Sequence, residues 1–256
     1  MSSPPAAAAA DAFMGGRLRL VQPESGHRAG LDAVMLAAAA PVAAGDRVLD
    51  AGTGAGVVGL CIAQRVPGCV VTGIEIEAGL AELAASNAKR NGLGQRYRAV
   101  CADLTLPLTQ LECHGLQRES FEVAVANPPF YGSGRGSPSS DPGRRRASVM
   151  PEGGLESWVR TLTAMTVAGG ALVLVHQAAA LADILAALKD RCGAVTVLPL
   201  FPRAGEPAHR LLVTARKGSR APMVLRRGLV LHGAGNAFTP EAEAVLRHGA
   251  ALDLTS

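Results

Sequence analysis

Between residues 45 and 176, short apolar runs alternate with longer, Ala-rich stretches. Short apolar runs are typical of buried strands, and helical stretches between them are typical of a parallel sheet made of βαβ units. The pattern predicts an α/β fold with a mostly parallel sheet. Strands are expected over residues 47–50, 69–75, 97–102, 121–126 and 171–176, and helices over residues 57–65, 79–90, 152–167 and 178–191.

The two ends of the chain show weaker patterns. Residues 195–200 and 210–216 are apolar runs around a Pro/Gly turn, which predicts an antiparallel hairpin at the sheet edge. A small helix is expected around residues 31–40. Residues 1–12 form a Pro/Ala tract without the positive charge of a signal peptide, so we expect a disordered leader followed by one domain over residues 13–256.

Composition narrows the classes of protein. A hydrophobic content of 48% supports a large core, and with only eight aromatic residues this core must consist of Ala, Val and Leu. Five cysteines without a C-x-x-C pair argue against a disulfide framework or a zinc site. The longest apolar stretch, residues 29–44, is interrupted and too short to span a membrane. We therefore expect a cytoplasmic protein without a metal; the pattern indicates no oligomeric state.

A glycine-rich turn follows the first strand of the predicted sheet, in the run Asp50-Ala-Gly-Thr-Gly-Ala-Gly-Val-Val-Gly59. Its backbone amides can approach a ligand closely because no side chains intervene. The G-x-G-x-x-G spacing, with Glu75 about 20 residues on, also fits a dinucleotide fold and an NAD-type oxidoreductase. Asp50 would repel a pyrophosphate but suits a cationic ligand such as S-adenosylmethionine. The candidate contacts in this turn are Asp50, Gly52, Gly54 and Gly56.

Two acids follow neighbouring strands at the same edge of the sheet. Glu75 ends the second strand, where its carboxylate can accept hydrogen bonds from both hydroxyls of a ribose, with Glu77 as the alternative. Asp103 follows the third strand. Each acid alone is more typical of a solvated loop, but the two together in register with the glycine turn favour a binding site.

The segment Asn127-Pro128-Pro129-Phe130 follows the fourth strand. The prolines hold the backbone rigid, so the Asn127 side-chain oxygen and the Pro128 carbonyl are fixed acceptors. Two such acceptors can bind both N–H groups of a conjugated amine and direct its lone pair at a methyl group, while Phe130 stacks on the planar group. No histidine and carboxylate pair with catalytic spacing is present, and this arrangement needs none.

The glycine turn resembles motif I of class I methyltransferases, and Asn127-Pro128-Pro129-Phe130 resembles motif IV of the enzymes that methylate amino or amide nitrogens. The resemblance implies a Rossmann-like, mostly parallel seven-stranded sheet with a C-terminal antiparallel hairpin, and S-adenosylmethionine as cofactor. It also implies that Asp103 accepts a hydrogen bond from the adenine amino group of the cofactor. Adenine-N6 enzymes and protein-glutamine enzymes share motif IV.

Residues 22–37, together with Phe13-x-Gly-Gly16, resemble the bacterial tRNA adenine-N6 methyltransferases that modify the adenosine beside the anticodon of one valine tRNA. In that group this segment packs over the cofactor. The resemblance makes Arg28 and Asp32 candidate cofactor contacts, and an ion pair between them that caps the first helix is an equally good interpretation.

Basic residues concentrate in two places, although the net charge of the whole chain is only +4. Residues 203–227 hold seven basic residues and one acid, and the loop after Phe130 adds several arginines. Such clusters favour a nucleic-acid partner, with a solvated arginine face as the alternative. Together with the resemblance, they predict tRNA or another structured RNA as partner. The alternatives to a tRNA adenine-N6 methyltransferase are a protein-glutamine methyltransferase and a noncatalytic RNA-binding module. The candidate substrate contacts are Tyr131, Arg144, Arg145, Arg146 and Arg210.

Overall fold

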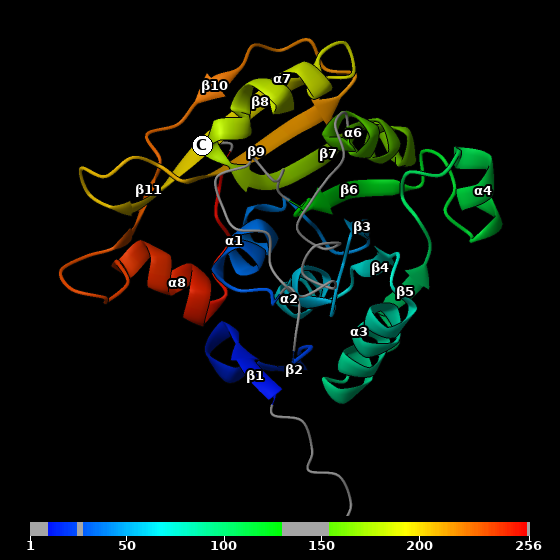
Figure 1. The fold of residues 1–256 in the computed structure, drawn as a ribbon, viewed down its shortest axis with the longest axis horizontal. Coiled ribbons are helices and arrows are strands. Elements are labelled where there is room, and N and C mark those ends of the chain that lie inside the picture. Colours follow the sequence, from blue (N-terminus) through cyan, green and yellow to red (C-terminus); the bar gives the residue numbers. More distant parts are fainter. Residues whose placement is uncertain (1–9, 25–27, 130–153, 255–256) are drawn as a thin grey trace, which may run out of the picture.

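The computed structural model describes residues 10–24, 28–129 and 154–254. Its central sheet has the strand order β5-β4-β3-β6-β7-β9-β8 (Figure 1). The five strands from β5 to β7 are parallel, and β9 is antiparallel to both of its neighbours. The bounds are β3 Arg47–Ala51, β4 Val70–Glu75, β5 Tyr97–Cys101, β6 Phe121–Ala126, β7 Thr166–Gln177, β8 Cys192–Arg203 and β9 Arg210–Lys217.

Helices cover both faces of this sheet and produce two apolar clusters. Successive strand residues point to opposite faces, so Val48 belongs to one cluster and Leu49 to the other. The first cluster includes α1 (Leu31–Ala39), α2 (Val57–Arg65) and α3 (Ala78–Arg90). The second includes α4 (Leu108–Cys113), α6 (Gly154–Met165) and α7 (Leu181–Leu188), which a short 3₁₀ turn, η2 (Ala178–Ala180), precedes. The expected α/β architecture is confirmed.

The predicted strands are all present, but the C-terminal hairpin is not at the edge. Two short strands, β10 (Val224–Leu225) and β11 (Leu229–His232), pair in parallel with β8. Within the described residues the sheet therefore has nine strands. Strands of two and four residues are too short to show a periodic pattern, so they were not predicted from the sequence. Nor was α8 (Pro240–His248), whose N-terminus is capped by the Thr239 hydroxyl.

Part of the predicted leader is a strand. Ala10–Phe13 forms β1, which pairs with β2 (Leu18–Val21) across the 3₁₀ turn η1 (Met14–Gly16). The side chain of Asn87 in α3 and that of Asn91 just after it bond the backbone of β2 as a neighbouring strand would. Asn87 and Asn91 each bond both backbone groups of one β2 residue, Val21 and Arg19, at 2.9–3.0 Å. The expected boundary after residue 12 is therefore corrected, because these tertiary contacts order a segment with little hydrophobic patterning.

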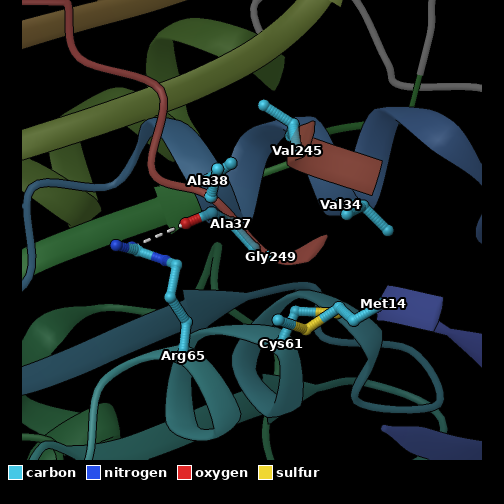
Figure 2. A pocket seen from close by; sticks show the side chains of 9 residues that line it. Met14, Val34, Ala37, Ala38, Cys61, Arg65, Val245 and Gly249 are labelled. Carbon is cyan, nitrogen blue, oxygen red and sulfur yellow. Dashed lines mark hydrogen bonds between the residues drawn. The ribbon is translucent and has the colours of Figure 1, made fainter. Parts of the chain in front are cut away.

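A small pocket lies among η1, α1, α2 and α8, drawn in Figure 2. Apart from Arg65, its lining residues are uncharged. The Arg65 guanidinium donates to the carbonyls of Ala37 (2.9 Å) and Ala40 (2.7 Å), and so caps the end of α1. We interpret this pocket as a packing site. In the part of the chain that the structure describes, no helix is long and apolar enough to cross a membrane.

Candidate active site

The carboxyl ends of four parallel strands bring the candidate residues into one row. Ala51 pairs with Ile74 on one side and with Ala126 on the other. Because the strands are parallel, the residues that follow these pairs are also neighbours, so Gly52 lies beside Glu75 and beside Asn127. Neighbouring strands lie about 4.8 Å apart, so one ligand can contact all three residues. This edge is where doubly wound folds bind ligands.

The three glycines of the turn differ in what surrounds them, although all have positive φ, at +66°, +56° and +90°. Gly52 is exposed, and a Cβ added to Gly54 would have no atom within 4 Å. Gly56 is buried, and a Cβ there would lie 3.1–3.2 Å from Leu60, Ala84 and Tyr97. A Cβ on Gly52 would lie 2.6 Å from Trp158 Cη2, so one side of this exposed residue is covered. Gly54 and the exposed side of Gly52 can therefore face a ligand, whereas Gly56 is required for packing.

Asp50 lies beneath the glycine turn and is only 1% exposed. Its Oδ2 accepts hydrogen bonds from the Thr53 hydroxyl (2.5 Å) and from the backbone N–H of Gly59 in the first turn of α2 (2.9 Å). The carboxylate thus caps α2 in place of a side chain at its N-cap residue, Gly56. In this structure Asp50 makes internal contacts, which differs from the direct ligand contact that we expected.

This placement bears on the dinucleotide alternative. Dinucleotide folds place the pyrophosphate at the positive end of the helix that follows the glycine turn. Here the Asp50 carboxylate already occupies that end of α2. The loop is therefore unsuited to a pyrophosphate, as the sign of the Asp50 charge had indicated.

Thr53 and Tyr97 complete the network below the turn, and neither was among the residues predicted from the sequence. The Thr53 hydroxyl donates to Asp50, so the Tyr97 hydroxyl donates to Thr53, at 2.8 Å. A Cβ on Gly73 would lie 2.5 Å from the Tyr97 oxygen, so a glycine there makes room for the ring. Burial raises the pKa of Tyr97, which keeps its hydroxyl protonated. The signal available in the sequence was a rare aromatic residue at the start of a strand.

We expect Asp50→Asn to change how stability depends on pH. Burial raises the pKa of Asp50 from 3.8 to about 6, with hydrogen bonds from Thr53 and Gly59 opposing the shift and the Glu75 charge adding to it. Because the folded state holds this proton more tightly than the unfolded state, its contribution to stability falls as pH rises from about 4 to about 6. A tenfold difference in proton affinity corresponds to about 1.4 kcal/mol, so the loss is at most about 3 kcal/mol.

The asparagine carbonyl can accept both hydrogen bonds that Oδ2 accepts, so the variant should keep the fold without the buried charge. Urea unfolding at several pH values should show Asp50→Asn gaining stability relative to the wild type across that window. Parallel pH curves for the two proteins would contradict this assignment. Tyr97→Phe provides a control, since it removes a hydroxyl from the same network without removing the carboxylate.

Glu75 connects the glycine turn to the start of α3. The residue is 7% exposed, and its two oxygens accept from the N–H groups of Gly54 (2.9 Å) and Glu77 (3.1 Å). Each carboxylate oxygen can accept a second hydrogen bond, so Glu75 retains capacity for a ligand. The Glu77 side chain, our alternative, is exposed. Ile76 between them is 59% exposed, an apolar surface at the edge that was not predicted from the sequence.

Asp103 is half-buried just beyond β5. Its Oδ1 accepts from the backbone N–H (2.8 Å) and the hydroxyl (2.7 Å) of Thr105. Within the described part of the chain, Oδ2 accepts no hydrogen bond. One oxygen of this carboxylate therefore fixes the turn, and the other can accept a hydrogen bond from a ligand.

Asn127 directly follows β6 and is half-buried, and Pro128 after it is buried. Among the residues that the structure describes, none forms a hydrogen bond with the Asn127 amide. A polar side chain at a sheet edge, held by two prolines and without an internal partner, is suited to a ligand. Phe130 and Tyr131, our candidate stacking residues, lie outside the described residues, as do Arg144, Arg145 and Arg146.

Arg28 and Asp32 do not pair with each other. The Arg28 guanidinium donates to the Asp11 carboxylate and to the Pro23 carbonyl. Asp32, in the first turn of α1, accepts from Arg210 Nε at 2.9 Å. The alternative interpretation, an ion pair between Arg28 and Asp32, is therefore wrong. Two other ion pairs attach the N-terminal segment and α1 to their neighbours.

The basic segment of residues 203–227 does not form a single patch. Arg210 begins β9 beside Gln177, the last residue of β7, whereas Arg216 pairs with Ala171. Six residues of extended strand separate them by about 20 Å. Lys217 bonds Glu119, while Arg226 bonds the Leu254 carbonyl. Only part of this charge lies near the carboxyl edge, because an antiparallel strand carries it across the sheet.

The groups at the carboxyl edge of the sheet indicate which kind of ligand fits there. Within the described residues, no group of three or more His, Cys, Asp or Glu side chains could hold a metal ion. At Gly52 and Gly54 the backbone is accessible, and the carboxylates of Glu75 and Asp103 can accept further hydrogen bonds. These groups fit a ligand with hydroxyl and amino hydrogens and a positive charge, which describes S-adenosylmethionine.

Comparisons with known proteins agree with this geometry. The model of the family "Methyltransferase small domain" matches residues 28–138. A tRNA1(Val) (adenine(37)-N6)-methyltransferase of Aeromonas hydrophila is 30% identical over 197 residues, 75% of this chain and 77% of that protein. Its counterpart in Aeromonas salmonicida is 28% identical over 217 residues, 83% and 85% of the two chains.

A solved structure extends the similarity to most of the fold. It is described as a predicted O-methyltransferase from Agrobacterium tumefaciens, and it matches with a TM-score of 0.71 and 32% identity. The match covers 84% of this chain and 94% of that one. The chain therefore belongs to the class I S-adenosylmethionine-dependent methyltransferases, in the family of the tRNA1(Val) (adenine(37)-N6)-methyltransferases.

Proposed function

We propose that this protein transfers a methyl group from S-adenosylmethionine to the exocyclic N6 amine of an adenine in tRNA. The observation that carries the proposal is the position of Asn127, in one row with Gly52 and Glu75 and followed by two prolines. The names of the relatives supply the target, adenine 37 of tRNA1(Val), beside the anticodon. We also propose a cytoplasmic location, which the tRNA substrate named for the bacterial relatives supports.

Residues of three strands would hold the cofactor. Gly52 and Gly54 allow its close approach to the backbone, and Glu75 accepts hydrogen bonds from the ribose hydroxyls. Asp103 accepts from the adenine amino group, and the exposed Ile76 side chain offers an apolar contact for the adenine ring. When bound, S-adenosylmethionine supplies a methyl group on a sulfonium, which is a good leaving group.

Asn127 and Pro128 would orient the target amine. The side-chain oxygen of Asn127 and the Pro128 carbonyl would accept hydrogen bonds from its two N–H groups, which favours a pyramidal nitrogen with its lone pair directed at the methyl group of the cofactor. Rigid placement of the reactants is worth roughly 7–11 kcal/mol of the barrier, so no strong general base is required. Phe130 would stack on the base, with Tyr131 supporting it.

Positive charge would position the RNA. We propose that Arg144, Arg145, Arg146 and Arg210 contact tRNA phosphates, while Arg28 and Asp32 act by ordering the N-terminal segment and α1 around the cofactor. Phosphate contacts make binding dependent on salt and largely independent of sequence. The shape of the tRNA, rather than a broad stacking surface, would then select the substrate.

One assay tests the proposal. The protein is incubated with methyl-labelled cofactor and with fractionated RNA, DNA and protein, and the modified group is then identified. We expect N6-methyladenosine in tRNA, lost on ribonuclease treatment and reduced steeply at higher salt. Label on a protein glutamine or on a hydroxyl oxygen would refute the proposed acceptor. RNA binding without label would indicate a noncatalytic module.

A further inference from the structure

The single tryptophan of the chain lies against the glycine turn. Trp158 belongs to α6, on the face that also carries Leu155, Val159 and Leu162 into the second apolar cluster. Those three residues are buried, whereas Trp158 is only half-buried. A core role therefore accounts for part of the indole and leaves the rest unexplained.

One edge of the indole ring lies against Gly52. A Cβ added to Gly52 would lie 2.6 Å from Cη2, 3.2 Å from Cζ3 and 3.7 Å from Cζ2 of Trp158. The six-membered edge of the indole thus lies next to the backbone of Gly52, which is itself exposed. Gly52 lies between Glu75 and Asn127, so the indole reaches the centre of the candidate site from the face of the sheet that α6 covers.

An aromatic ring in this place has a physical use that the rings of Tyr97 and Phe121 do not offer. Tyr97 lies below the turn and is buried, and Phe121 is at the opposite end of β6. The Trp158 ring can cover aliphatic atoms of a ligand that crosses Gly52 and exclude water there.

We propose that Trp158 forms a wall of the cofactor site and contacts S-adenosylmethionine where the cofactor crosses Gly52. The inference rests on the proposed function, because it requires that this cofactor binds at the glycine turn. It adds a binding residue from α6 to the residues that the strand ends supply.

The test uses the full chain and the product S-adenosylhomocysteine as well as S-adenosylmethionine. Calorimetry measures the affinity of each compound, and tryptophan emission reports on residue 158 alone, since the chain has one tryptophan. We expect emission to change in parallel with calorimetric saturation. Trp158→Ala should weaken binding roughly tenfold or more, and Trp158→Phe less, because phenylalanine keeps a ring.

Val159→Ala is the matched control, because Val159 is the next residue of α6 and is fully buried in the same cluster. It should lower stability without changing affinity, which separates loss of packing from loss of contact. The Trp158 contact is refuted if calorimetry shows that the wild type binds the cofactor and that Trp158→Ala binds it with the same affinity as Val159→Ala. This holds whatever the emission shows. If Trp158→Ala does not fold, either of two other results refutes the contact. One is that the tryptophan emission of the wild type does not change when the cofactor saturates it. The other is that Trp158→Phe binds the cofactor with the same affinity as the wild type. If the wild type binds neither compound, the proposed function itself fails.

Discussion

Asn127→Ala is expected to reduce methyl transfer by about 10³-fold or more while leaving cofactor affinity within about tenfold of the wild type. The amide has no hydrogen-bond partner among the described residues, so its removal should cost little in the unliganded fold. It would remove one of two acceptors for the target amine, an interaction needed most in the transition state. Single-turnover transfer to tRNA, together with calorimetry of cofactor binding, measures the two effects separately.

Asn127→Asp is the matched variant for this prediction. Aspartate keeps an acceptor oxygen at the same distance from the backbone, so transfer should be measurably higher than in Asn127→Ala. Joint loss of transfer, cofactor affinity and thermal stability in Asn127→Ala would mean that the residue is structural. That result would remove the main support for an amine acceptor.

Glu75→Gln is expected to weaken cofactor binding on the order of 100-fold, since hydrogen bonds to a charged group are worth about 1.5–3 kcal/mol each. Both oxygens of Glu75 accept from backbone N–H groups, of Gly54 and Glu77. A glutamine amide has one oxygen and one NH2 group, so it must direct a donor at one of these donors. The substitution therefore disturbs the glycine turn as well as the proposed ribose contact.

Glu77→Gln is the control for Glu75→Gln. It removes the same charge two residues away, but the Glu77 side chain is exposed and only its backbone N–H joins the network. We expect cofactor affinity in this variant to stay at the wild-type value. Equal losses in the two variants would show that net charge near the edge, rather than the Glu75 geometry, controls binding.

Local signals were sufficient for the parallel part of the fold. Val57–Arg65 and Phe121–Ala126 have the predicted bounds, because a glycine precedes the first and a rigid Asn-Pro-Pro follows the second. The strands that the sequence did not predict are those that depend on partners elsewhere in the chain. β2 is held by Asn87 of α3 and by Asn91 just after that helix, β1 pairs with β2, and β10 and β11 pair with β8.

The candidate site divides in the same way. The register of parallel strands places Gly52, Glu75 and Asn127 together, and this follows from their positions just past or at predicted strand ends. The direction of a side chain does not follow from such positions. Asp50 lies under the loop as a helix cap, and the indole of Trp158 reaches Gly52 from another element.

By itself, the sequence determined the fold class, the candidate binding edge of the sheet and the residue types that meet there, because period, turn residues and strand ends are local properties. Only the tertiary structure decided which of these groups are free to face a proposed ligand. It assigned Asp50 and Gly56 to the interior, paired Arg210 with Asp32 and spread the basic segment across the sheet. Burial, charge pairing and strand direction arise from residues far apart in the chain, and a local pattern does not contain them.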